Sequence, residues 1–155
     1  MIIADTSPLN YLILIDAAEV LPKIFQKVII PTAVQSELLD IGASEKVQKW
    51  IQSAPNWLEV EKVDKIDQNI NLGLGEVEVI SLAVEISVDL ILLDDKAARL
   101  SATQRNLQVI GTLGVLKLAD EQKFIDFEIA LKRLQKTNFR ASKVLLEALL
   151  NRDKN

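Results

Sequence analysis

Short apolar runs alternate with longer segments of mixed polarity along this chain. The runs have the length and the branched apolar composition of buried strands, and they lie at residues 1–5, 27–30, 57–60, 90–93 and 107–110. Between the runs, apolar residues recur at helical spacing over residues 9–18, 32–40, 44–53 and 76–87, and again after residues 111–114. Strands that alternate with helices predict a parallel sheet covered by helices on both faces.

Two further helices are expected in the C-terminal part, residues 121–152, with a break near Thr137 and Asn138. The first of them carries one apolar stripe, made of Phe124, Phe127, Leu131 and Leu134. No linker or low-complexity segment divides the chain, so we expect a single domain over residues 1–155.

Composition narrows the chemistry. The chain has no cysteine and no histidine. Disulfides, thiolate zinc sites, cysteine nucleophiles and the commonest general base are therefore excluded. Carboxylates remain the main candidates for catalysis or metal binding, and oxygen ligands favour hard cations.

Charge and hydropathy set further expectations. The net charge of -4 argues against a broad nucleic-acid surface, although it permits a local basic strip beside an acidic site. The apolar runs are far shorter than the roughly 20 residues that a membrane span needs. The chain opens on a strand-like run without a basic leader, so we expect no signal peptide and a cytoplasmic location.

Two carboxylates follow buried runs directly. Asp5 and Asp94 each come at the end of a predicted strand, and ligands of parallel sheets bind outside the carboxyl ends of the strands. Both side chains are therefore expected in one site. The alternative is that each aspartate only caps the helix that follows it.

The helix over residues 76–87 places its two glutamates differently. Glu76 lies near the middle of a wide apolar arc, so its carboxylate is expected to point inward and to need a cation as partner. Glu78 shares the opposite face with Ser81 and Glu85 and is expected to be solvated. The alternative for Glu76 is a wet first-turn residue that serves the free backbone donors of the helix.

Glu37 borders the apolar stripe of its own helix, and alone it would be interpreted as a surface residue. Glu37 becomes a candidate site residue only when it is considered together with the other three acids. Asp5, Glu37, Glu76 and Asp94, gathered at one sheet edge, would repel one another unless a cation is bound or some are protonated.

Basic residues suggest where a nucleic acid would bind. Lys96 and Arg99 follow Asp94 closely and could hold phosphates, or they could be solvated or brace the acids. A basic strip runs through Lys123, Lys132, Arg133, Lys136, Arg140 and Lys143. It is a candidate surface for an RNA backbone, with a solvated helical face as the alternative. No aromatic platform for stacking bases is apparent.

The motifs together resemble the PIN-domain nucleases, and more closely the PIN-like branch related to toxins of toxin–antitoxin pairs. The segments that carry the resemblance are residues 5–9, 31–38, 73–83, 92–99 and 111–116. The resemblance implies a three-layer α/β/α fold with a central parallel sheet and C-terminal helices. It also implies hydrolysis of RNA phosphodiesters with Mg²⁺ or Mn²⁺.

The resemblance further implies residue roles. The catalytic acids would be Asp5, Glu37, Glu76 and Asp94. Three of them, Asp5, Glu76 and Asp94, would ligate the metal, while Glu37 positions a water or a second ion. Ser7 would assist near the metal, and Asp95 is a second candidate for the last acid, because typical members have Thr-x-Asp where this chain has Leu92-Leu93-Asp94-Asp95. Lys96 and Arg99 would bind the substrate.

Two rival hypotheses remain. A non-catalytic PIN-like interaction module would use the acids to bind a structural metal or an arginine of a partner, such as a small antitoxin. A receiver-like phosphoacceptor also gathers acids at strand ends, but this chain lacks an acidic pair after its first strand. The apolar run at residues 144–150 could form a homodimer or pack on its own domain.

Overall fold

The structure is a computed structural model that describes residues 1–40, 42–141 and 146–147. Its strands form one parallel sheet in the order β3-β2-β1-β4-β5. The strands are β1 (Ile2–Ala4), β2 (Val28–Pro31), β3 (Leu58–Glu61), β4 (Leu90–Leu92) and β5 (Gln108–Ile110). Each predicted strand is confirmed to within a residue or two at its ends.

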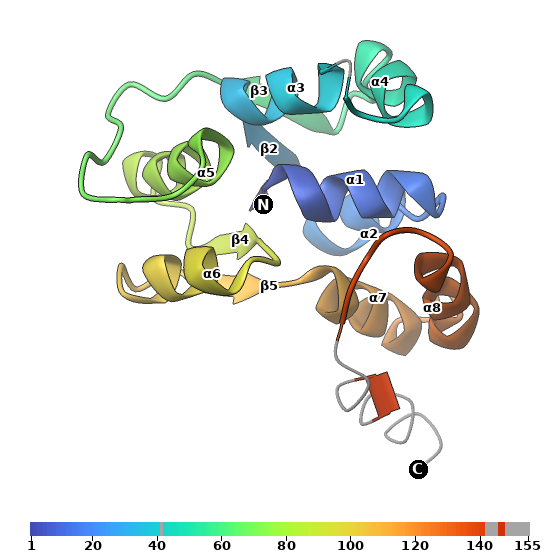
Figure 1. Cartoon of the computed structure of the whole chain (residues 1–155). Coiled ribbons are helices and arrows are strands. Elements are labelled where there is room, and N and C mark those ends of the chain that lie inside the picture. The colour runs from blue at the N-terminus through green and yellow to red at the C-terminus, as the bar shows by residue number, and fades with distance from the viewer. Residues whose placement is uncertain (41, 142–145, 148–155) are drawn as a thin grey trace.

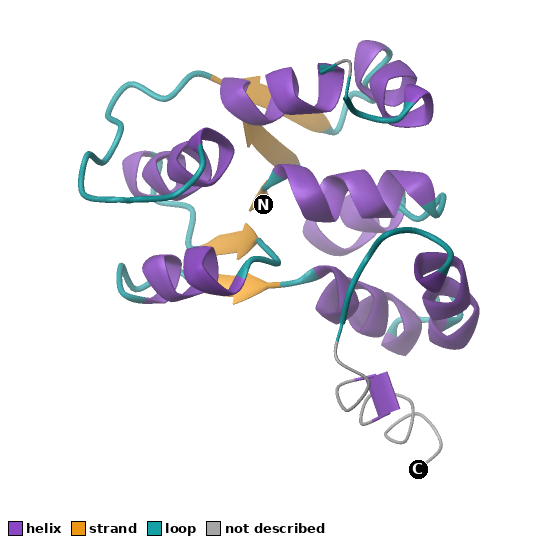
Figure 2. Cartoon of the chain, viewed as in Figure 1, coloured by secondary structure: helices purple, strands orange, loops and turns teal. Residues whose placement is uncertain are grey.

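Helices connect the strands in chain order. They are α1 (Thr6–Leu14), α2 (Val20–Phe25), α3 (Thr32–Leu39), α4 (Glu45–Gln52), α5 (Leu74–Glu85), α6 (Lys96–Thr103), α7 (Thr112–Glu121) and α8 (Phe127–Gln135). Figures 1 and 2 show α5 and α6 on one side of the sheet and α1, α2 and α7 on the other. The expected three-layer α/β/α arrangement is confirmed.

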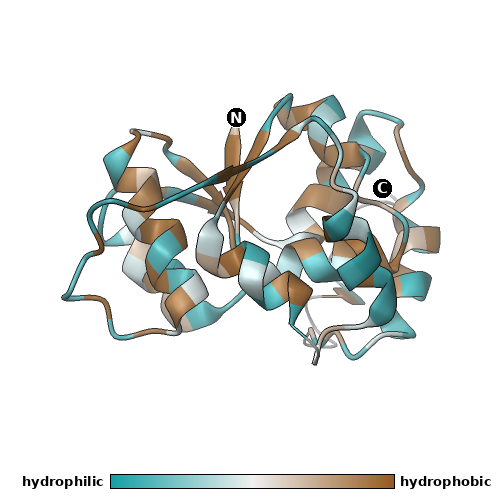
Figure 3. Ribbon diagram, turned by 90° about the horizontal axis from the view of Figure 1, so that it is seen from above, coloured by the Kyte–Doolittle hydropathy of each residue, from teal (hydrophilic) through white to brown (hydrophobic). Residues whose placement is uncertain are grey.

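Two of the central strands, β1 and β2, are buried along their whole length. Every residue of β1 and β2 is buried, and Figure 3 shows the hydrophobic colouring concentrated along the sheet. Strands covered on both faces are apolar throughout, which is why these short runs stood out in the sequence. Among the described residues, no helix combines the length and the apolar character that crossing a membrane requires.

The strand order creates a switch point beside β1. The chain passes from β1 outward to β2 and β3, and then returns through α5 to β4 on the other side of β1. Ala4 pairs with Leu92, and the backbone N–H of Asp5 donates to the carbonyl of Leu92 at 3.0 Å. Such a switch point opens a crevice at the carboxyl ends of the two strands, and Asp5 and Asp94 flank it.

Several predicted helix limits were wrong. The first helix begins at Thr6 and ends at Leu14, because Asp16 takes a left-handed conformation with a φ of 61°. The short helix α2 was not predicted. Phe124 precedes α8 and is 38% exposed, so it does not join the buried stripe of that helix. The rest of the expected last helix, with Lys143 and most of residues 144–150, falls outside the described residues.

Candidate functional site

Asp5 is the most enclosed carboxylate at the switch point. It directly follows β1 and is 5% exposed. It occupies the N-cap position of α1, yet its side chain makes no capping hydrogen bond. The capping alternative therefore does not explain why a carboxylate is buried here.

The surroundings of Asp5 oppose its negative charge. The pKa of Asp5 is raised from 3.8 to about 7. Burial is the largest cause, the Thr6 backbone N–H acts in the opposite direction, and the charges of Glu76, Glu37 and Asp94 add to the rise. A carboxylate in this position needs either a proton or a cation. The four acids gathered by the sequence prediction thus act on one another electrostatically.

Asp94 follows β4 and has a different environment. Both of its carboxylate oxygens accept hydrogen bonds from Thr112, the first residue of α7: the backbone N–H donates at 2.7 Å and the Oγ1 hydroxyl at 2.6 Å. Thr112 is fully buried. One residue therefore fixes both oxygens of Asp94 at the positive end of a helix.

The turn before α7 leaves little space beside this carboxylate. A Cβ atom added to Gly111 would come within 2.8 Å of Asp94 Oδ1 and 3.1 Å of Arg99 Nη1. Thr112 was not among the predicted site residues, which included Ser7 as their one hydroxyl side chain. The place of Thr112 directly after β5, at the edge where Asp5 and Asp94 lie, was the signal that could have identified it.

Asp95 caps a helix. It is the N-cap of α6, and its Oδ2 accepts from the backbone N–H of Ala98 at 2.9 Å. It is exposed, so this cap does not remove it from the site. Its charge is one of the causes that raise the pKa of Glu76.

Glu76 lies in the first turn of α5 and is half-buried. Burial raises its pKa most, followed by the charges of Asp95 and Glu37, while the backbone of Gly73 acts in the opposite direction. Glu76 thus lies near other carboxylates and is less buried than Glu78.

The prediction that Glu78 is an ordinary solvated glutamate was wrong. Glu78 is 8% exposed, and its Oε1 accepts from the backbone N–H of Ala33 at 3.1 Å and from Thr32 Oγ1 at 3.4 Å. Pro31, the N-cap residue of α3, provides no side-chain cap, so Glu78 supplies it from the neighbouring helix. Ser81 on the same face is also buried, and it accepts from the backbone N–H of Asp67 at 2.9 Å.

Glu37 reaches the group from α3. Its carboxylate accepts a hydrogen bond from the hydroxyl of Thr6, which follows Asp5. It also lies against α5, where a Cβ atom added to Gly75 would come within 2.6 Å of Glu37 Oε2. The absence of a side chain at position 75 is what lets the Glu37 carboxylate approach the start of α5.

A pocket of about 340 Å³ collects most of the predicted residues, and we call it the acid pocket. Its lining consists of Asp5, Ser7, Tyr11, Glu76, Asp94, Asp95, Asn138, Phe139 and Arg140. Ser7 is exposed at its rim. Glu37 does not line it, and instead borders a separate hollow with Asp40 and Glu78.

The donor set of the acid pocket suits a divalent cation of the Mg²⁺ type. All its acidic groups are carboxylates, the ligands that hard cations prefer. Burial, together with repulsion between acids, raises the pKa of Asp5 and Glu76. Among the described residues, no three carboxylates are already close enough together to hold one ion. Mg²⁺ keeps several waters and binds through one or two carboxylates, so the residues fit such an ion without a closed cage.

Two aromatic side chains that were not among the predicted site residues lie at the pocket. Tyr11 and Phe139 both line the acid pocket, and their rings meet edge to face with centroids 5.1 Å apart. The Tyr11 hydroxyl donates to Asn138 Oδ1 at 3.0 Å. These contacts hold residues 138–140, which lie far away in the sequence, beside the switch point.

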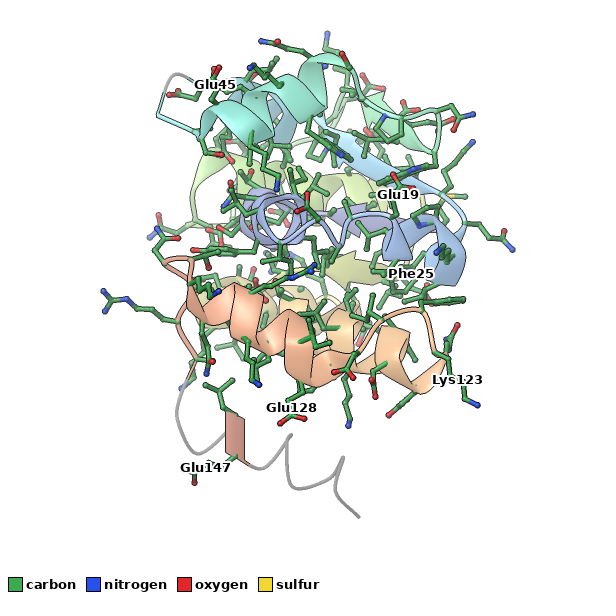
Figure 4. All side chains as sticks on the ribbon, turned by 90° about the vertical axis from the view of Figure 1, so that its right-hand side faces the viewer. Glu19, Phe25, Glu45, Lys123, Glu128 and Glu147 are labelled. Atoms are coloured by element: carbon green, nitrogen blue, oxygen red, sulfur yellow. The ribbon has the colours of Figure 1, made fainter. Side chains whose placement is uncertain are left out.

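The predicted basic residues do not form one surface. Arg140 lines the acid pocket, and Arg99 lines a second pocket that shares Asp94 with it, whereas Lys96 is exposed at the start of α6. Figure 4 shows Lys123 on the side of Phe25, which precedes β2 and so marks the amino edge of the sheet. Lys123 therefore lies away from the acids.

Comparison with known proteins agrees with this architecture. A family model described as a PIN domain matches residues 1–155, and no curated protein matches the sequence. PIN domains are in general nucleases that use divalent metals and act on nucleic acids. The five-stranded parallel sheet with acids at its switch point is consistent with that match. The chain belongs to the PIN-domain family.

Proposed function

We propose that this single-domain chain is a divalent-metal-dependent ribonuclease that hydrolyses RNA phosphodiester bonds in the cytoplasm. The observation that carries the proposal is the buried Asp5 carboxylate, whose pKa is raised to about 7 by burial and by three neighbouring acids. A fold that needs only a stable core has no reason to keep such a group, and perturbed carboxylates in a pocket favour a functional site.

The residues divide into ligands and supports. Asp5, Glu76 and Asp94 would hold Mg²⁺ or Mn²⁺. Asp95, which is exposed near Glu76, is an alternative ligand. Once bound, the cation would lower the pKa of a water molecule and offset the charge of the attacked phosphate. Thr112 fixes the orientation of Asp94. Ser7 lies at the pocket rim, where a hydroxyl could hydrogen-bond a substrate oxygen.

Glu37 has a distinct part in the proposal. It lies outside the acid pocket but close enough to raise the pKa of both Asp5 and Glu76. At this position it would accept a proton or orient a water molecule, and its bond from Thr6 keeps the carboxylate directed toward Asp5.

Substrate contacts follow from the cations near the acids. Arg99 and the exposed Lys96 would bind RNA phosphates on the α6 side of the acid pocket. The toxin of a toxin–antitoxin pair is the biological role that this activity would suit. A small antitoxin could then inhibit the enzyme by placing a basic side chain among the acids, and a homodimer is a further expectation.

The direct test is cleavage of a mixed pool of structured and single-stranded RNAs by the purified protein with Mn²⁺, Mg²⁺ or EDTA. Wild type should cut only with metal, and Asp5→Asn and Glu76→Gln should each lose at least about a hundredfold in rate. Glu45→Gln, on the outer surface of α4, serves as the matched control. A folded wild type that cuts nothing with either metal would contradict the proposal and favour the interaction module.

A further inference from the structure

A second pocket adjoins the acid pocket and contains fewer carboxylates and more apolar side chains. Its volume is about 440 Å³, within the roughly 300–1,000 Å³ of typical ligand pockets. Its lining consists of Asp94, Arg99, Val109, Ile110, Gly111, Leu113, Gly114, Phe139, Arg140 and Ala141. Three of these residues, Asp94, Phe139 and Arg140, also line the acid pocket, so the two pockets lie side by side.

The second pocket combines two arginines with apolar side chains, and Asp94 is its one carboxylate, on the side shared with the acid pocket. Arg99 and Arg140 are exposed, and neither forms an ion pair with a carboxylate among the described residues. Val109, Ile110 and Leu113 supply aliphatic surface, and Phe139 supplies an aromatic ring. Guanidinium groups bind phosphate oxygens in pairs of hydrogen bonds, while apolar and aromatic walls favour the face of a base.

We infer that this second pocket is a nucleotide subsite for single-stranded RNA, which seats the nucleotide next to the phosphate under attack. We call it the base subsite. Arg99 and Arg140 bind the phosphate of that nucleotide, and its base lies against Phe139 and the aliphatic wall. A base can enter such a pocket only if it is unpaired, so the enzyme prefers single strands or loops over duplexes. The inference rests on the proposed ribonuclease function, because it takes RNA as the ligand.

The test is equilibrium binding of a short fluorescein-labelled single-stranded RNA, followed by anisotropy. Ca²⁺, which takes the same oxygen ligands, replaces Mg²⁺ to limit cleavage. Arg99→Gln and Arg140→Gln should each weaken binding by about tenfold and flatten the dependence of log K on log salt by about 0.7. Lys49→Gln, which removes one charge from the outer surface of α4, should change neither value appreciably.

A second variant separates base recognition from phosphate binding. Phe139→Leu should weaken binding of the RNA by about fivefold or more. The same variant should bind an abasic chain of equal length as wild type does, because that probe lacks the stacking group. Equal losses for both probes would mean that Phe139 only supports the local structure. A duplex of the same sequence should bind wild type more weakly than the single strand.

The outcomes distinguish this inference from the ribonuclease proposal. Arginine variants that bind the single strand as tightly as Lys49→Gln, or a wild type that does not bind it at all, would overturn the base subsite. If wild type cleaves RNA in the separate assay despite that result, the ribonuclease proposal stands alone. If wild type cuts nothing but binds with the predicted dependence on both arginines, the subsite stands and the catalytic proposal fails.

Discussion

Asp5 and Asp94 occupy equivalent places in the fold but differ in what stabilises them. Each follows a buried parallel strand, and the two strands are neighbours in the sheet. Asp94 has both oxygens bound by Thr112, whereas Asp5 is buried without a side-chain cap bond and is surrounded by the charges of other acids. The protein itself therefore fixes the carboxylate of Asp94, whereas the carboxylate of Asp5 requires a proton or a cation.

The difference predicts opposite effects of the same substitution at the two positions. The pKa of Asp5 is raised from 3.8 to about 7, so the folded state holds the proton more tightly than the unfolded state. Stability from this group is full below about pH 4, falls as the pH rises toward 7, and is lost above it. That difference in pKa corresponds to roughly 4 kcal/mol.

In EDTA at pH 8, Asp5→Asn should therefore raise the free energy of unfolding by roughly 2–4 kcal/mol, with little effect at pH 4. Asp94→Asn should lower it by about 1 kcal/mol at pH 8, because the charged acceptor for Thr112 is lost. Urea unfolding of both variants at the two pH values measures these effects. Changes of the same sign at pH 8 would refute the contrast.

The start of α3, the helix that carries Glu37 toward Asp5, is capped by a buried glutamate that does not line the acid pocket. Glu78→Ala should lower the free energy of unfolding by about 1–2 kcal/mol, because the Ala33 N–H at the start of α3 loses its cap. Glu78→Gln keeps an acceptor oxygen and should lose less than half as much. Thermal unfolding of the two variants provides the comparison, and equal losses would show that the cap bond is unimportant.

The Asp94 carboxylate is held in place in part by the hydroxyl of Thr112. Thr112→Val keeps the shape and the backbone donor but removes the Oγ1 donor, and it should raise the metal concentration for half-maximal cleavage on the order of tenfold. Thr112→Ser, which keeps the hydroxyl, should stay within about threefold of wild type. A serine variant as impaired as the valine variant would mean that packing, not the hydrogen bond, matters.

The smallest expected effect on stability concerns a glycine. Gly75→Ala should change the free energy of unfolding by less than about 1 kcal/mol, since alanine favours helices and the clashing group is the mobile end of the Glu37 side chain. It should nevertheless displace Glu37 and lower the pKa of Asp5, which the Glu37 charge helps to raise. In urea unfolding, the pH range over which stability falls should therefore move to lower pH.

Gly73→Ala is the matched control for that variant. A Cβ atom at position 73 would lie 3.7 Å from Glu76 Oε1, an ordinary contact distance. Its pH dependence should therefore match that of wild type. If the pH dependence of Gly73→Ala shifts as far as that of Gly75→Ala, the shift does not arise from the contact with Glu37.

The sheet and most helices could be predicted because their signal is local. Apolar runs in β1, β2 and β4 are continuous, and Asp5 and Asp94 follow them directly. Position after a strand was enough to bring these two acids together, since parallel strands end at one edge. Helical periodicity was less informative for α5, where Glu76 is half-buried and Glu78 is buried.

What could not be predicted depends on contacts between distant segments. Glu78 was expected on a wet face, but α3 packs against that face and takes a cap from it. Phe139 and Arg140 reach the acid pocket because Tyr11 binds the segment after α8. No periodicity within one helix contains such information, and so the aromatic side of the pocket was missed.

The central claim is that the acids around Asp5 hold a divalent cation, and calorimetric titration of the protein with Mn²⁺ near pH 6.5 tests it most directly. Run in two buffers of different ionisation enthalpy, it counts the protons released. Saturable Mn²⁺ binding by wild type with release of on the order of one proton is predicted, because Asp5 must lose its proton to bind, and Asp5→Asn should abolish that release. Absence of binding, or equal proton release by Asp5→Asn, would contradict the account.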